Sequence, residues 1–307
     1  MEEDSGYEVK VLLEGAIPER QEEMNGYWDK YNPYCSRVDD RPGYLMEGGA
    51  FQILKFTQRT MQQMWMLGFA ATHAYNLYSQ SLARLRLCSG TLDTGELCNG
   101  SAQAEQEEKY QDLVRSVYKL SDVSDPTSFT WPSNIPNPKD RKPTGDDDAA
   151  TYNLVCMAGA YVFLHEIRHI MFLKDNNCPS SRHDEELECD SFAQSMILDK
   201  LGHYAMKNGC DLHRLKSQRA MSISLALFFM LVITPQENWG GTDTHPSIAE
   251  RVESMAGKLS IHDDDIFWVY MASLFLAHIR YLDTTPFLIV FKTLRDLATT
   301  LSLLQNP

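Results

Sequence analysis

Residues 151–173 have the sequence TYNLVCMAGAYVFLHEIRHIMFL, which is the most informative stretch of the 307-residue chain. Val155, Val162 and Leu164 belong to an apolar run that is typical of a buried helix. Three aspartates at 146–148 precede this run, and acidic residues in a first turn suit the positive end of a helix dipole. We therefore predict one long helix over residues 146–173, which carries the motif HEIRH at 165–169.

The motif HEIRH has the form HExxH, which is typical of zinc enzymes. Residues four apart lie on one face of a helix, so the rings of His165 and His169 can bind one zinc ion at about 2.0–2.1 Å each. Glu166 would lie beside the metal, where its carboxylate can accept a proton from water. The alternative is that both histidines are core imidazoles with satisfied hydrogen bonds. We favour the zinc site, because an unpartnered Glu166 would be costly to bury in these apolar surroundings.

A catalytic zinc ion needs a third protein ligand, and the segment EELECD at 185–190 offers several. Glu186 and Asp190 are four apart on one face of a predicted helix, so Glu186 can bind the metal while Asp190 accepts a ring N–H from a histidine. The rivals that we weigh are Glu185 and Glu188, interpreted as a solvated acidic face, His183 and the small thiol Cys189. We prefer Glu186.

The third informative segment is THPSIAER at 244–251. His245 is fixed between a proline and a helix start, because Ser247 and Glu250 have the spacing of a capping box. Such a group can stabilise an oxyanion. The alternative is that His245 and Arg251 merely brace the helix.

The remaining pattern predicts an α+β chain that is mainly α. We expect a small mixed or β region over 1–56 and a helical domain over 57–307, with a Pro-rich loop at 121–148 before the active helix. The expected strands are 7–13 and 50–56, and the expected helices besides 146–173 are 57–87, 108–120, 184–201, 219–233, 247–257, 263–281 and 286–304. Thr285 and Pro286 are the expected start of the last helix, and Gly257 the expected end of the helix at 247.

Composition narrows the function. With 28 Lys+Arg against 42 Asp+Glu, the net charge of -14 opposes binding to nucleic acid or to an anionic membrane. The seven cysteines include no CxxC and the start MEED is not basic, so we expect reduced thiols and a cytoplasmic location. The most apolar segment, 221–233, is shorter than the roughly 20 residues of a bilayer span, so we favour a core helix over membrane association.

In this order, HEIRH, EELECD and THPSIAER resemble the gluzincin pattern HExxH…ExxAD…THPxxxxR. That pattern is shared by HtpX-type membrane zinc peptidases and by Lit-type phage-exclusion peptidases. The chain is more similar to the Lit type, which has a similar length, lacks several membrane spans and carries a proline-rich stretch before the active helix. The likeness covers about residues 50 to 260 and implies a zincin-like metallopeptidase with one Zn²⁺.

Carried over by position, the resemblance implies His165, His169 and Glu186 as zinc ligands and Glu166 as general base. Asp190 and Arg251 would support the ligands, and His245 would stabilise the transition state. Apart from the resemblance, we expect a nearby tyrosine such as Tyr161 or Tyr204 to help His245 bind the oxyanion. Cys189 stands where the family pattern has alanine.

The resemblance also implies a protein substrate, bacterial elongation factor Tu, cleaved in phage defence. We expect a latent enzyme with a phage-derived activator and with the segments 88–108 and 121–148 as gates. Two alternatives stay open, a zinc hydrolase acting on another bond and a binding protein with a structural zinc. A strand edge beside the active helix would favour peptides, and 128–131 is a weak candidate for that edge.

Overall fold

The computed structural model describes residues 5–85, 90–97, 101–138 and 145–305, and it confirms an α+β fold that is mainly α. The strands are β1 (Tyr34–Arg37), β2 (Met46–Gly48), β3 (Ile53–Phe56), β4 (Thr91–Asp93) and β5 (Leu288–Val290). The helices are α1 (Ser5–Ala16), α2 (Gln21–Tyr31), α3 (Gln58–Leu85), α4 (Ser101–Asp122), α5 (Asp146–Asp175), α6 (Arg182–Leu198), α7 (Leu201–Asn208), α8 (Leu212–Ile233), α9 (Ile248–Lys258), α10 (Ile266–Leu282) and α11 (Leu294–Leu303).

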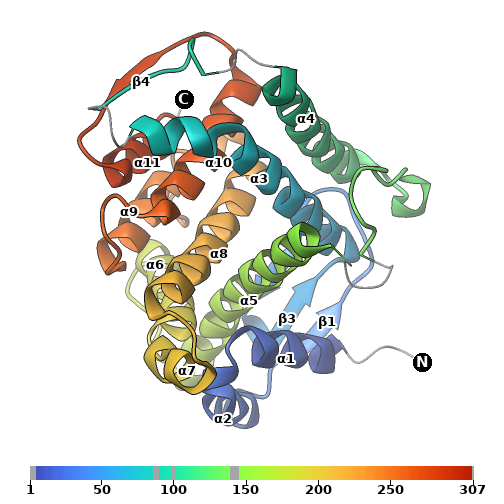
Figure 1. Cartoon of the computed structure of the whole chain (residues 1–307). Helices are drawn as coiled ribbons and strands as arrows, with labels where there is room; N and C mark the ends of the chain where they lie inside the picture. The colour runs from blue at the N-terminus through green and yellow to red at the C-terminus, as the bar shows by residue number, and fades with distance from the viewer. Residues whose placement is uncertain (1–4, 86–89, 98–100, 139–144, 306–307) are drawn as a thin grey trace.

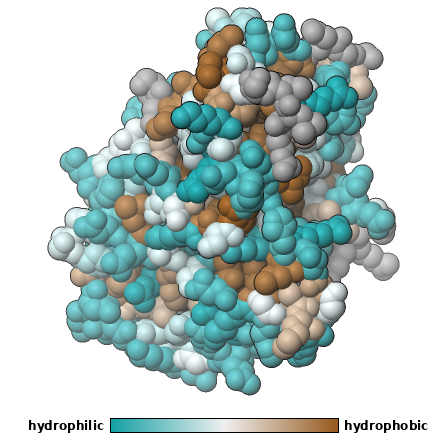
Figure 2. All heavy atoms as spheres, turned by 60° about the vertical axis from the view of Figure 1, so that its left-hand side comes forward, coloured by the Kyte–Doolittle hydropathy of each residue, from teal (hydrophilic) through white to brown (hydrophobic). Residues whose placement is uncertain are grey.

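Two long helices, α5 and α8, lie side by side in the middle of the molecule, and α3 and α10 pack around them (Figure 1). Both have apolar residues around much of their circumference, as buried helices do. By length and composition alone both could cross a bilayer, and 72% of the apolar window of each is buried inside the protein. Hydrophilic side chains cover most of the face drawn in Figure 2, with hydrophobic ones between them near its middle.

A small three-stranded sheet near the N-terminus packs against α5 and positions the site. Its order is β1-β3-β2, with β1 parallel and β2 antiparallel to β3. The ring of Phe56 on β3 meets that of Phe163 on α5 edge-on, with 5.3 Å between centroids. Because β2 is an edge strand that contacts α5, its free edge lies beside HEIRH.

One hydrophobic core runs through the described residues from Val9 to Leu301, and it includes side chains from the region 1–56 and from the helices after it. A second, two-stranded sheet pairs β4 with β5, which joins segments almost 200 positions apart. The buried segment of α8 agrees with the core helix expected at 221–233.

Two of the expected helices and strands are wrong. Residues 7–13 are not a strand but part of α1, whose buried residues Val9, Leu13 and Ala16 follow helical spacing and face α5. The last helix does not begin at Thr285 and Pro286, because 288–290 form β5. It begins at Leu294, after a capping box made by Thr293 and Asp296.

The other expected helices are present with shifted ends. The helix at 108–120 is longer and begins at Ser101, α9 continues one residue past Gly257, and α2 and α7 were not expected. The expected strand at 50–56 is real only over 53–56, because a 3₁₀ turn, Ala50–Gln52, precedes it. The capping box of Ser247 and Glu250 is confirmed.

Candidate active site

Helix α5 brings the two histidines of HEIRH together. Their ring centroids are 5.0 Å apart and their Nε2 atoms only 3.2 Å apart, so both rings turn the same nitrogen toward one point. The spacing of four residues on a rigid, buried helix accounts for this arrangement.

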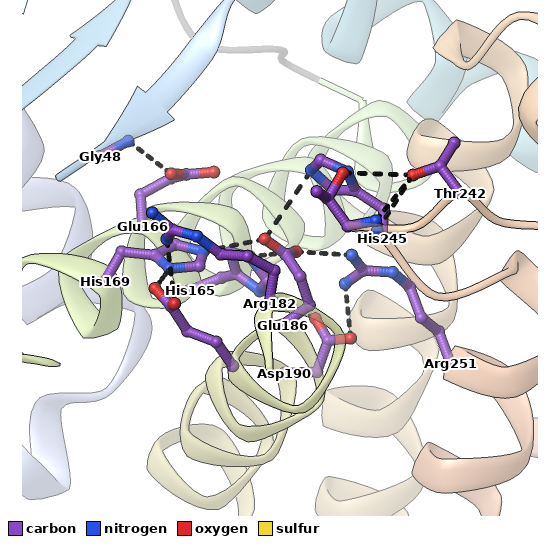
Figure 3. Close-up of polar contacts among 12 residues, drawn as sticks. Gly48, His165, Glu166, His169, Arg182, Glu186, Asp190, Thr242, His245 and Arg251 are labelled. Carbon is purple, nitrogen blue, oxygen red and sulfur yellow. Dashed lines mark hydrogen bonds and ion pairs between the residues drawn. The ribbon is translucent and has the colours of Figure 1, made fainter. Parts of the chain in front are cut away.

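Helix α6 supplies the carboxylate that faces this pair. It starts at an N-cap, Ser181, and packs along α5. One oxygen of Glu186 lies 3.3 Å from Nε2 of His165, and its other oxygen lies 3.3 Å from Nε2 of His169. The preferred third ligand therefore lies against both rings (Figure 3).

A second pair of carboxylates fixes the orientation of each ring. Asp190 lies 2.9 Å from Nδ1 of His165, and Glu185 lies 2.7 Å from Nδ1 of His169. If each Nδ1–H donates to its carboxylate, the lone pair of each Nε2 is left free to bind a metal. Glu185 is buried and also accepts from Arg182, so its interpretation as a solvated residue is wrong.

The three facing donors have the spacing of a zinc site. Ligands about 2.0–2.1 Å from a tetrahedral zinc ion lie about 3.3–3.4 Å from one another. The two Nε2 atoms are 3.2 Å apart, and each lies 3.3 Å from a different oxygen of Glu186, so these separations are close to the ligand spacing of a zinc site. Three electron-rich atoms this close repel one another unless a proton or a metal ion is shared among them.

The surrounding charges favour a cation at this point. Burial lowers the pKa of His165, but the carboxylates of Asp190 and Glu186 outweigh it and raise the pKa to about 10. Burial raises the pKa of Glu186, but the two imidazoles and Arg251 hold it well below its usual range.

Cys189 offers a further donor. Its sulfur and one ring nitrogen each of His165 and His169 lie within 4.8 Å of one another, so these three residues could also hold a metal ion. The thiol is fully buried, and burial together with the charge of Glu186 raises its pKa. A neutral thiol is a poor ligand, because the metal binds the thiolate.

Arg251 ties α9 to the site. Its guanidinium donates to Glu186 at 2.7 Å and to Asp190 at 2.6 Å. The capping box of Ser247 and Glu250 fixes the first turn of α9, from which Arg251 projects. The buried guanidinium therefore holds in place both Glu186, the expected metal ligand, and Asp190, the hydrogen-bond partner of His165.

Glu166 points the other way, toward the sheet (Figure 3). Its Oε2 accepts the backbone N–H of Gly48 on β2 at 2.6 Å. Burial raises the pKa of this carboxyl, although His165 and His169 act to lower it. Gly48 leaves no room for a side chain, since a Cβ there would lie 2.4 Å from the carbonyl oxygen of Glu166.

His245 lies at the rim of the site. Its Nε2 is 3.8 Å from Oε1 of Glu186, and its side chain is 61% exposed. Two threonines hold it: Thr244 Oγ1 is 2.8 Å from its Nδ1, and its backbone N–H donates to Thr242 Oγ1 at 3.1 Å. Gly48 and His245 both line the cleft, and Figure 3 draws them on opposite sides of Glu186.

One cleft with a volume of about 730 Å³ is lined by the site residues His165, Glu166, His169, Glu186, His245 and Arg251. Besides the residues named above, its walls include Met46 on β2, Met230 and Ile233 on α8, and Tyr44. Tyr161 and Tyr204 are not among the described residues that line the cleft, although we expected one of them to help His245 bind the oxyanion. Tyr44 is the tyrosine that the structure brings to the cleft, and burial raises its pKa, as does the charge of Glu166.

The remaining rivals for metal binding lie elsewhere. Glu188 is exposed, as expected for an acidic surface residue. His183 lies 3.5 Å from the carboxylate of Glu250. The weak candidate for an edge strand, 128–131, contains no strand, and β2 takes that place.

A comparison with protein families bears on this arrangement. A family model described as Peptidase U49 matches residues 54–271. The chain belongs to the peptidase U49 family. The match covers all three motif segments and supports the resemblance to Lit-type peptidases. Comparison of this U49 peptidase with curated proteins and with solved structures finds no match.

Proposed function

We propose that this peptidase is a zinc-dependent endopeptidase whose metal ligands are His165, His169 and Glu186. The observation that carries the proposal is the triangle formed by two Nε2 atoms, 3.2 Å apart, and the Glu186 carboxylate, whose two oxygens each lie 3.3 Å from one of them. Glu166 follows a ligand directly in sequence and lies beside this triangle without belonging to it. A purely structural metal would need no such additional half-buried carboxylate.

The chemistry follows from where the protein's own groups lie. A bound zinc ion would supply Lewis acidity and make a water molecule more acidic. Glu166 accepts a proton from the attacking water and later gives it to the leaving amine. The raised pKa of Glu166 suits both the uptake of the proton from water and its release to the amine. The N–H of Gly48 fixes the position of one carboxylate oxygen of Glu166.

His245 would donate a hydrogen bond to the oxyanion that forms as the carbonyl is attacked. It is held by Thr242 and Thr244, and it is close enough to Glu186 to reach a substrate at the metal. Asp190, Glu185 and Arg251 hold the ligands in place and take no part in proton transfer.

The edge strand β2 favours a peptide over another kind of substrate. Its free edge borders the cleft, and an extended chain can bind such an edge through main-chain hydrogen bonds. Hydrolysis of a different bond by the same metal set is the less favoured alternative.

The substrate and setting rest on the resemblance to the Lit type. We propose that the enzyme acts in the cytoplasm on elongation factor Tu during phage infection and is latent until a phage-derived activator binds. The proposed gates, 88–108 and 121–148, include residues 88–89, 98–100 and 139–144, which lie outside the described residues. Of these segments, Ser121 lines the cleft, whereas 91–93 pair with β5.

The test uses wild type, Glu166→Gln and, as a matched control, Glu188→Gln on the exposed face of the same site region. Each is incubated with a bacterial lysate, with and without phage proteins, and new protein termini are mapped. We expect wild type and Glu188→Gln to cleave one protein, and Glu166→Gln to keep its zinc while losing about 10³-fold or more in rate. Cleavage by Glu166→Gln at the wild-type rate would refute the mechanism.

A further inference from the structure

The turn between β2 and β3 holds an aromatic residue in an unfavourable position. Phe51 has φ 58° and ψ 21°, and Gln52 follows with φ 61°, so two successive residues other than glycine are left-handed. Bulky residues rarely adopt this conformation. The phenyl ring gains no burial in return, since Phe51 is 90% exposed.

The turn is anchored on both sides of this residue. The Gln52 backbone N–H donates to the carbonyl of Gly49 at 3.0 Å, and the Gln52 side chain accepts from Lys174 on α5 at 3.1 Å. Leu173 lies next to Gly49, since a Cβ at Gly49 would be 3.4 Å from its Cδ1, and Leu173 is itself 41% exposed. Phe51 is therefore a fixed projection with a second apolar side chain near its base.

The position of the turn connects it to the active cleft. Gly48, three residues before Phe51, lines the cleft and binds Glu166. Leu173 is one helical turn after His169 on α5. Phe51 and Leu173 therefore lie next to β2, the edge strand along which we place the substrate chain.

We propose that Phe51 is a docking anchor that inserts into an apolar recess on the surface of a folded protein substrate, next to the segment being cleaved. The inference rests on the proposed function. Strained residues that persist without a packing role are found at binding and active sites. Aromatic side chains are also the most frequent anchors of protein interfaces. Phe51 is not among the residues that line the cleft, so we expect a short peptide in the cleft to make no use of it.

The test compares two substrates: the folded protein identified by terminus mapping, and a short synthetic peptide that spans its cleaved bond. Phe51→Asn removes the ring and keeps the turn, because asparagine tolerates the left-handed region. Tyr34→Asn is the matched control, since Tyr34 is an exposed aromatic residue on β1, the opposite edge of the same sheet. Phe51→Trp keeps an aromatic anchor.

We expect Phe51→Asn to lower kcat/KM for the folded protein about tenfold, mainly through KM, and to leave the peptide within about twofold. Tyr34→Asn and Phe51→Trp should cleave both substrates like wild type. The melting temperature of Phe51→Asn should not fall, which separates docking from folding.

The anchor is refuted if Phe51→Asn cleaves the folded protein as wild type does, or if it loses protein and peptide cleavage equally. Failure of wild type to cleave any protein would instead refute the proposed function, and this inference with it.

Discussion

At the scale of single residues, Glu186 and Cys189 compete to complete the metal site. The two oxygens of Glu186 each lie 3.3 Å from one ring nitrogen, whereas burial and nearby carboxylates raise the pKa of the Cys189 thiol, which must lose its proton to bind a metal ion. Glu186→Gln should therefore weaken zinc binding about 100-fold or more, and Cys189→Ala should leave it nearly unchanged. Metal content after dialysis and titration against a competing chelator measure the difference. The opposite ranking would make Cys189 the ligand.

The residues of the site differ in how well sequence could identify them. His165 and His169 share one helical face by their spacing, and so do Glu186 and Asp190. That the two faces meet was expected from the need for a third metal ligand and from the resemblance to a known motif order. Glu185 could have been found as well, because a second ligand histidine needs a second carboxylate for its other nitrogen.

Gly48 and Tyr44 could not have been found in this way. The contact between Gly48 and Glu166 joins residues 118 positions apart, and it exists only because β2 packs on α5. Tyr44 reaches the cleft for the same reason.

At the scale of elements, the start of α9 matters for the metal site. Ser247→Ala removes half of a capping box and should cost about 1 kcal/mol of stability. It should also loosen the turn that presents Arg251 to Glu186 and so lower the affinity for zinc. Thr293→Ala is the matched control, because it removes the equivalent cap of α11, which contributes no residue to the cleft wall as described. Urea melts and zinc titrations of both variants measure the two effects.

Comparison of Ser247→Ala with Thr293→Ala shows whether the loss of zinc affinity is specific to the cap of α9. If both variants lose similar stability and zinc affinity is unchanged in each, the cap of α9 stabilises its helix without tuning the site.

The elements that sequence predicted poorly are those decided by distant partners. Residues 7–13 alternate in polarity like a strand, yet packing on α5 selects a helix. Residues 288–290 became β5 because they pair with β4, almost 200 positions earlier. The long helices α3, α5, α8 and α10 have strong patterns of their own, and the sequence predicted each of them to within a few residues, except that α8 begins seven residues earlier than expected.

At the scale of the whole molecule, stability should depend on pH through His278. This residue on α10 is fully buried among Phe228, Trp239 and Tyr281, and neither ring nitrogen has a partner among the described residues. Burial lowers its pKa to about 3. Below the ordinary pKa of about 6.5 the unfolded chain binds a proton that the folded chain refuses, so stability falls as the pH falls toward 3.

We expect this residue alone to remove about 2 kcal/mol of unfolding free energy between pH 7.5 and pH 5. His278→Leu should lose less on acidification, and at pH 7.5 it should be at least as stable, because two unpaired nitrogens are gone. His203→Leu, at an exposed position, is the control and should follow wild type. Thermal melts at the two pH values measure the effect, and an equal acid response of all three proteins would contradict it.

The close approach of Gly48 to α5 sets limits for inhibitor design. The amide of Gly48 is already engaged by Glu166, so a peptide mimic laid along β2 must take its main-chain register from the neighbouring positions instead. The short distance between β2 and α5 also leaves room at position 48 for the hydrogen atom of glycine but not for a methyl group, which would press on the backbone of α5. Gly48→Ala would therefore shift the backbone that carries both Glu166 and the neighbouring ligand His165, which makes Glu166→Gln the better inactive form for trapping bound substrates.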